Sequence, residues 1–395
     1  MKRFFSYIIL SFFLLLLPTG QASANNNDSI RLSLLTCAPG EEIYSLFGHT
    51  AIRYENPSQG IDVVFNYGLF SFNTPNFIFR FSLGETDYQL GATDYERFAA
   101  EYAFFGRSVW QQTLNLTDEE KTELIRLLQE NYRPENRVYR YNFFYDNCAT
   151  RPRDKIEESI AGKVIYPAEP QDGSLTFRDI VHQYCKGHPW ARFGIDLCIG
   201  SEADQPITQR QMMFAPFYLM DAFDGAQIKG DSIQRPLITA NELVVDATPE
   251  PDESDWMPTP LQCSLLLFIL TTAATIYGIR RRTGLWGIDL FLFGIAGIVG
   301  CVLAFLALFS QHPAVSSNFL LLVFHPGQLF FLPYIIYCVR KGKKCWYLTL
   351  NLVILTLFIV LFPVIPQRFD FAVVPLALVL LIRSASNLIV TSKKK

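Results

Sequence analysis

The chain has 395 residues, a formal net charge of -3 and a composition that is 50% hydrophobic. A net charge near zero, with no basic patch in the polar part of the chain, argues against a nucleic-acid partner. The average conceals two regions, because charges occur throughout residues 25–258 whereas residues 261–390 are mostly apolar runs. We therefore expect an α/β (α+β) domain outside the membrane, followed by a helical membrane domain.

The first 24 residues are typical of a cleavable export signal. The positive start MKR precedes the apolar run FFSYIILSFFLLLL, which is too short to cross a bilayer comfortably, and ASA ends the segment. We expect a signal peptide over residues 1–24 and a mature chain from about Asn25. A retained anchor is the alternative, and Pro18, Gly20 and the small-residue pattern argue against it.

Alternating residues predict strands at the start of the polar region. SIRLSLLTCAPG gives the first strand, and HTAIRYE and IDVVFNYG flank the turn-rich NPSQG as a hairpin. In the register that we predict, Arg53 faces Asp62 as a cross-strand ion pair and His49 faces Asn66. A slip of one residue would move every side chain to the other face.

Capping patterns predict the helices that follow. TDYE at 93–96 and TDEE at 117–120 each place an acidic residue three positions after a threonine, which predicts two helix starts. The first helix is expected to end near Phe105. Residues 107–116 and 136–144 predict further strands, and the second of these leads directly to Cys148.

The segment FFYDNCATRPRDKI places Cys148 at or just before a helix. The N-cap is Asn147 or Thr150, and Pro152 in the first turn favours Thr150. Backbone N–H groups at a helix start favour a thiolate and can bind an oxyanion, and a histidine such as His49 can take the thiol proton.

The cysteine pattern leaves the role of Cys148 open. No spacing typical of a metal site occurs, so no metal and no other cofactor is expected. In an oxidising compartment Cys185 and Cys198 can pair. Cys37 and Cys148 then remain, and they either bond each other or supply a working thiol. By itself this pattern favours a buried or disulfide-bonded Cys148 over a nucleophile.

The apolar region predicts five membrane spans and a cytoplasmic C-terminus. Positive clusters follow the first, third and fifth spans, so the positive-inside rule makes those ends cytoplasmic, in agreement with the export signal. The expected parts are a polar domain over 25–245, a Pro- and acid-rich linker over 246–260, a membrane domain over 261–390 and a basic tail over 391–395. The expected spans are 261–279, 285–309, 318–339, 346–363 and 371–390.

Two polar residues interrupt the apolar runs. His325, followed by Pro326, lies in the third span and Arg383 lies in the fifth. Ionisable groups inside a membrane often mark function. The alternatives are a helix kink at His325 and an Arg383 side chain that reaches toward the cytoplasmic face.

Three motifs in order carry a family resemblance. SLLTCAPGEEIYSLFGHTAIRY, FNYGLFSF and FFYDNCATRPRDKI resemble the soluble domain of the Lnb family of lipoprotein N-acyltransferases, over roughly residues 30–165. The later spans fit that family's two-part layout. The domain is also similar to the permuted papain-like group that includes NlpC-type enzymes and lecithin:retinol acyltransferase. There a histidine on an early strand precedes a cysteine at a helix start.

The resemblance implies a thiol acyltransferase. Cys148 would be the nucleophile and His49 the general base and acid. Related enzymes often carry a second histidine on the next strand; this chain has none there, and Asn66 is the nearest polar candidate to orient His49. Further candidates for a substrate or oxyanion site are Asn147, Thr150, Tyr67, Arg153 and His325. For several of these, capping, ion pairing or packing is the alternative.

The implied partners are lipids at one membrane surface. A membrane phospholipid would donate an acyl chain through a Cys148 thioester to the α-amine of a diacylglyceryl-cysteine, giving a triacylated lipoprotein. The implied place is the inner (cytoplasmic) membrane, with the catalytic domain in the periplasm. The alternatives are a Cys/His hydrolase of peptidoglycan peptides or lipid esters, and a non-enzymatic envelope scaffold.

Overall fold

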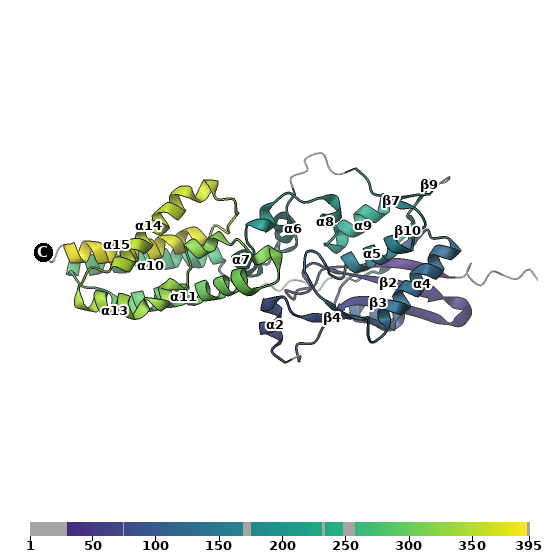
Figure 1. Ribbon diagram of the computed structural model, residues 1–395, viewed down its shortest axis with the longest axis horizontal. Coiled ribbons are helices and arrows are strands. Elements are labelled where there is room, and N and C mark those ends of the chain that lie inside the picture. The colour runs from purple at the N-terminus through teal and green to yellow at the C-terminus, as the bar shows by residue number, and fades with distance from the viewer. Residues whose placement is uncertain (1–29, 74, 169–174, 231–233, 248–256, 393–395) are drawn as a thin grey trace, which may run out of the picture.

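The computed structural model describes residues 30–73, 75–168, 175–230, 234–247 and 257–392. The expected signal peptide and most of the expected linker lie outside these residues. The chain forms an α+β domain followed by an elongated helical bundle, and the two parts adjoin end to end (Figure 1).

An antiparallel seven-stranded sheet is the frame of the first domain. Its central strands are apolar on both faces because helices cover both. Leu124 and Ile156 from α4 and α5 pack on one face, and Phe98 and Tyr102 from α3 pack on the other. In spatial order the strands are β10 (Ile238–Val245), β5 (Val109–Leu114), β1 (Arg31–Cys37), β2 (His49–Asn56), β3 (Ile61–Leu69), β4 (Asp87–Asp94) and β6 (Val138–Arg140).

Short helices and a small second sheet complete this domain. The helices are α2 (Phe77–Leu83), α3 (Tyr95–Phe104), α4 (Asp118–Tyr132), α5 (Thr150–Ser159), α6 (Phe177–Tyr184), α7 (Pro189–Cys198), α8 (Gln209–Met212) and α9 (Pro216–Asp224), with 3-10 turns η1 (Pro57–Gln59) and η2 (Ser201–Asp204). The second sheet contains β7 (Lys163–Ile165), β8 (Gln227–Lys229) and β9 (Gln234–Pro236).

The hairpin register differs by two residues from the prediction. Ala51, not His49, is paired with Asn66, because η1 and a left-handed Gly60 form a tight turn that lets β2 continue to Asn56. A shift of two preserves the face of every side chain. Arg53 therefore still donates to both carboxylate oxygens of Asp62, at 2.8 and 2.7 Å.

Only one of the two predicted capping boxes forms. Thr117 and Glu120 cap α4 reciprocally, as predicted. The TDYE prediction was wrong, because Thr93 is part of β4, where it pairs with Val64, and α3 begins later at Tyr95.

Four helices of the second region are long and apolar enough to cross a membrane, among the residues that the structure describes. The predicted third span is not a continuous helix, because the chain breaks around His325 and Pro326. The four helices are α10 (Pro260–Arg281), α11 (Trp286–Phe309), α14 (Trp346–Leu361) and α15 (Val373–Ser392). The broken segment contains η4 (Phe319–Leu322), α12 (Gly327–Phe330) and α13 (Leu332–Lys341), and η3 (Pro313–Val315) and η5 (Phe362–Val364) lie in loops.

The broken segment still returns the chain to the basic end of the bundle. Arg340 at the end of α13 lies 5.1 Å from the ring centroid of Trp286, which begins α11. Arg383 does not reach out of the bundle. Its guanidinium bonds both carboxylate oxygens of Asp289, at 2.7 and 3.0 Å, and Thr275 at 2.9 Å, so it joins α10, α11 and α15.

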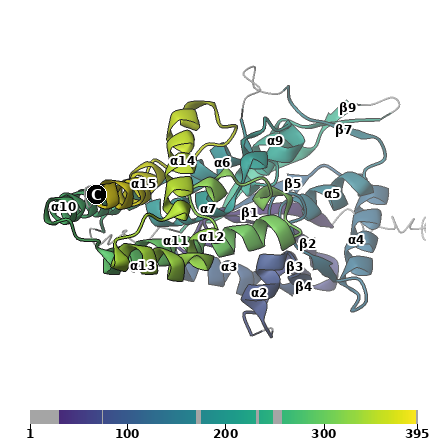
Figure 2. The same ribbon diagram turned by 60° about the vertical axis from the view of Figure 1, so that its left-hand side comes forward.

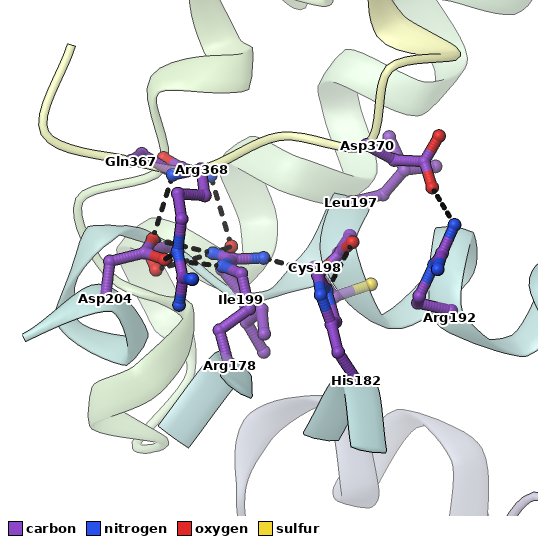
Figure 3. A network of polar contacts seen from close by, with 12 residues as sticks. Arg178, His182, Arg192, Leu197, Cys198, Ile199, Asp204, Gln367, Arg368 and Asp370 are labelled. Carbon is purple, nitrogen blue, oxygen red and sulfur yellow. Dashed lines mark hydrogen bonds and ion pairs between the residues drawn. The ribbon is translucent and has the colours of Figure 1, made fainter. Parts of the chain in front are cut away.

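Polar contacts fix the first domain onto the bundle. Arg368, in the loop between α14 and α15, donates to Asp204 at 3.0 Å (Figure 3) and also to Asp179 at 2.6 Å. The fully buried Arg178 also bonds Asp204 and holds Asp196 at 2.6 Å. The α6–η2 segment is thus the docking surface for the membrane bundle.

Candidate active site

The strand ends that face the bundle carry the first part of the site. His49 begins β2, and its Nε2 lies 2.5 Å from Oδ1 of Asn66 on β3. A carboxamide oxygen only accepts, so Nε2 carries the proton and Nδ1 is left as the basic nitrogen. The imidazole is therefore held in one tautomer, as a general base requires.

The turn before α5 positions the second part. Oδ1 of Asn147 accepts from the backbone N–H groups of Ala149 and Thr150, at 2.8 and 3.0 Å. Its amide nitrogen donates to the carbonyls of Phe143 and Phe214. Asn147 therefore caps the turn, rather than the preferred Thr150, and fixes the backbone on both sides of Cys148.

Gly68 is the point at which these parts meet. Its positive φ of 89° ends β3, and a Cβ built on it would lie 3.5 Å from Cβ of Cys148, 3.9 Å from Cε1 of His49 and 4.0 Å from the hydroxyl of Tyr139. Because Gly68 has no side chain, Cβ of Cys148, the imidazole of His49 and the hydroxyl of Tyr139 border one space beside it.

Burial determines the protonation states of Cys148 and His49. It raises the pKa of the Cys148 thiol to about 11, although the N–H groups of Thr50 and of Cys148 itself favour the thiolate. Burial also lowers the pKa of His49 to about 4, against the effect of the Asn66 hydrogen bond. Both groups are neutral near pH 7, so the helix-start preference for a thiolate that we expected is outweighed by desolvation. A thiolate at this position would therefore require transfer of the thiol proton to a neighbouring base.

Other candidate residues are engaged in local structure. Tyr67 is fully buried and its hydroxyl donates to Asn131 at 2.8 Å. The Thr150 hydroxyl accepts from the Asn147 N–H at 2.8 Å, and Arg153 bonds Asp154 and a backbone carbonyl.

His325 lies in the membrane bundle and is not brought to Cys148. Its Nε2 is 3.2 Å from Oδ1 of Asn351, and its Nδ1 is 3.4 Å from the Tyr347 hydroxyl. Asn351 in turn donates to Ser384 at 3.0 Å, so these contacts connect the broken third segment to α14 and α15.

All eight cysteines lie in the described part of the chain and all are free thiols. The possible Cys185–Cys198 pair is not formed. Cys37 is buried opposite His49 in the β1–β2 ladder and is not bonded to Cys148. Within the described residues, no group of His, Cys, Asp or Glu is arranged to hold a metal ion.

Sequence reasoning missed Gly68 and the tyrosines around the thiol. Tyr88 and Tyr139 are paired across β4 and β6 and pack in the core cluster against which Cys148 lies. Tyr141 stacks on Tyr88 with ring centroids 4.1 Å apart. The available signal was the glycine that follows the strand FNY, since a glycine ending a strand marks a close approach.

Fold and site together define a membrane-anchored α+β domain with a cysteine, a histidine and an asparagine at the sheet end that faces the bundle. The chain matches the Lnb N-terminal periplasmic domain over residues 20–182 and the Lnb transmembrane domain over residues 252–395. It therefore belongs to the Lnb family, with a periplasmic first domain and several membrane spans. The name of the second family domain specifies five transmembrane helices, which agrees with four long helices and one broken crossing. No curated protein and no solved structure matches the chain significantly.

Proposed function

We propose that this protein is a lipoprotein N-acyltransferase of the inner membrane that uses Cys148 as nucleophile and His49 as base. The observation that carries the proposal is the meeting of Cys148 and the Asn66-oriented His49 beside Gly68. An early-strand histidine and a helix-start cysteine also fit the permuted papain-like arrangement that the resemblance implies.

The first step forms a thioester. Nδ1 of His49 takes the thiol proton as the sulfur of Cys148 attacks the ester carbonyl of a phospholipid. The ester C–O bond then breaks, and His49 returns the proton to the leaving alkoxide, which departs as a lysophospholipid. The backbone N–H groups of Thr50 and Cys148 approach the sulfur and would be the nearest backbone donors to the oxyanion.

The second step transfers the acyl chain. The neutral α-amine of a diacylglyceryl-cysteine attacks the thioester carbonyl, and His49 removes a proton from the amine. The C–S bond breaks, the proton returns to the sulfur, and the product is an amide on a triacylated lipoprotein. Tethering the domain to a bundle confines the enzyme and both lipid substrates to one surface.

The direct test is a mass measurement. The protein in detergent is mixed with phospholipid and a diacylated lipoprotein, and the lipoprotein's N-terminal peptide is weighed. We expect a gain of one acyl chain. Cys148→Ser and His49→Ala should abolish at least 99% of the rate, because a triad-type site loses about 10³-fold or more on removal of a member.

Matched controls come from the same domain. Cys198→Ser and His188→Ala remove one thiol and one imidazole to which we assign no role, and both should retain the activity. Release of free fatty acid without transfer would identify a hydrolase instead. Full acyl transfer by Cys148→Ser would refute the assignment of the active site. If the wild-type protein shows neither acyl transfer nor hydrolysis, the non-enzymatic scaffold becomes the preferred function.

A further inference from the structure

An exposed aromatic surface lies between the thiol and the membrane bundle. We define the aromatic strip as Phe70, Phe72, Phe77, Ile78, Phe79 and Phe81. Ile78, Phe72, Phe79 and Phe81 are 78%, 64%, 58% and 46% exposed. Contiguous exposed apolar groups of this kind mark an interaction site.

The strip is continuous with the candidate active site. It follows Gly68 in the chain, and Phe70 packs on Tyr88 with ring centroids 5.0 Å apart. Phe77 stacks on Phe70 at 5.5 Å and on Phe81 at 6.2 Å. A row of rings therefore runs from the core around Cys148 to the outer surface of α2.

The other end of the strip touches a membrane helix. The rings of Phe79 and Phe305 are 5.7 Å apart, and Gln311 donates its backbone N–H to Leu83 at 2.9 Å. At about 1.5 Å per residue, Phe305 lies roughly 28 Å along α11 from Trp286. The hydrocarbon core is about 30 Å thick, so α2 lies at its outer edge. In both ribbon views α2 stands on the bundle side of the first domain (Figures 1 and 2).

Other exposed apolar residues gather at the same end of the sheet. Ile43 and Tyr44 lie in the loop between β1 and β2, and Phe104 and Phe105 lie just before β5. All four lie at the sheet end that carries His49.

We infer that the aromatic strip is immersed in the outer leaflet and admits one acyl chain of a phospholipid donor to Cys148. The inference rests on the proposed function for the fate of that chain, but not for contact with lipid. Rings and branched side chains offer apolar surface without hydrogen-bonding groups, which suits an acyl chain and not a peptide.

Crosslinking tests the contact without requiring catalysis. The photoreactive residue p-benzoylphenylalanine replaces Phe79, Phe72 or Ile165 in the full chain, reconstituted in phosphatidylethanolamine and phosphatidylglycerol vesicles. Ile165, which is 40% exposed, is the control because its strand, β7, lies away from the bundle in both views. We expect phospholipid adducts at positions 79 and 72 only. No adduct at 79 and 72, or equal adducts at 165, overturns the inference.

A kinetic test asks whether the strip delivers the donor. The combined exposed substitutions Ile78→Ser, Phe79→Ser and Phe81→Ser should lower transfer from long-chain phospholipid in vesicles at least tenfold. Transfer from a water-soluble dibutyryl phospholipid should change less than twofold. If the triple variant and the wild type transfer acyl chains from the vesicle phospholipid at equal rates, the aromatic strip does not deliver the donor. If the wild-type protein shows no acyl transfer, the proposed function is refuted. Lipid contact is then tested by the crosslinking experiment alone.

A separate observation concerns Tyr139. Its hydroxyl is buried, has no hydrogen-bond partner among the residues that the structure describes, and lies 4.0 Å from the Cβ position at Gly68, beside Cys148 and His49. An unpaired buried hydroxyl is unfavourable in the folded state. Arg151 lies 3.6 Å over the ring and holds it. The geometry points to Tyr139 as a donor to the oxyanion formed when the acyl carbonyl is attacked.

Tyr139→Phe separates this role from packing. Removing an unsatisfied hydroxyl should leave the melting temperature equal or higher. Removing an oxyanion donor should lower kcat about 100- to 1000-fold with little change in KM. Tyr67→Phe is the control, because its hydroxyl already bonds Asn131. An unchanged kcat for Tyr139→Phe, or a fall that accompanies a lower melting temperature, overturns the assignment.

Discussion

His49 shows how one side chain acquires its properties from several others. Asn66 fixes its tautomer, and burial holds its pKa near 4. A half-buried imidazole that is neutral at pH 7 is ready to accept a proton but does not ionise the thiol in advance. The site therefore resembles a general-base pair more than a preformed ion pair.

The pH profile follows from this arrangement. A base works only when unprotonated, so kcat/KM should persist as pH falls and decline only near His49's low pKa. Asn66→Asp places a carboxylate 2.5 Å from Nε2 and favours the imidazolium, which raises the pKa of His49. We expect the acid limb to move upward by at least one pH unit. It is measured as the initial rate of thioester formation between pH 4 and 8.

Asn66→Ala is the companion variant, since it removes the orienting group without adding charge. Its rate should fall at every pH while its acid limb stays near the wild-type position. An acid limb for Asn66→Asp that coincides with that of the wild type would exclude His49 as the titrating base.

Among the secondary-structure elements, the end of β3 contributes most to the geometry of the candidate active site. Gly68 has a positive φ that side chains rarely adopt, and the space next to it is where Cys148 and His49 meet. The end of β3 therefore needs a residue that adopts a left-handed backbone conformation and has no side chain, and glycine meets both conditions. The same hairpin contains Gly60, which has a φ of 65° but nothing within 4 Å of a Cβ.

These two glycines form a matched pair. Gly68→Ala and Gly60→Ala should each lower the free energy of unfolding by about 1–2 kcal/mol, because both place an L side chain in a left-handed conformation. Only Gly68→Ala should also reduce acyl transfer, by at least tenfold, since only its methyl group enters the shared space. Thermal unfolding and the transfer assay measure the two effects. Equal activity in both variants would show that this space is not used.

At the scale of the whole molecule, the periplasmic domain is fixed rather than loosely tethered. Gly200 and Ser201 donate backbone N–H groups to the carbonyls of Ala314 and Ser317 in the bundle. Arg368 adds side-chain bonds to Thr176, Asp179 and Asp204, which Figure 3 shows in part. A fixed domain keeps α2 and the candidate active site at a constant position relative to the bilayer.

Loss of Arg368 should loosen this docking. In Arg368→Ala we expect faster hydrogen exchange at residues 199–205 and 312–318, because the charged bonds that brace these backbone contacts are gone. Arg126→Ala is the control, since Arg126 pairs with Glu123 on the exposed face of α4. Unchanged exchange in Arg368→Ala would mean that the backbone contacts alone hold the domain.

The sequence alone determined the local features. The Thr117–Glu120 box, the alternation in β1 to β3 and the long apolar runs each depend on near neighbours, and each was predicted. The predicted cross-strand pairing of His49 with Asn66 was wrong, but the two side chains still lie on one face and in contact, because strands repeat every two residues. These features need no knowledge of distant segments.

The tertiary structure decided what depends on distant segments. Packing between elements far apart in the chain brings Cys148 and His49 together beside Gly68. It also leaves the Tyr139 hydroxyl without a hydrogen-bond partner among the described residues, and it accompanies the helix break at His325. Burial also reversed the expected preference for a thiolate, because desolvation of Cys148 exceeds the local effect of a helix start. The periodicity of the sequence predicts which face of a strand or helix carries a side chain. Only the folded structure determines how far that side chain is exposed to solvent and which groups it contacts.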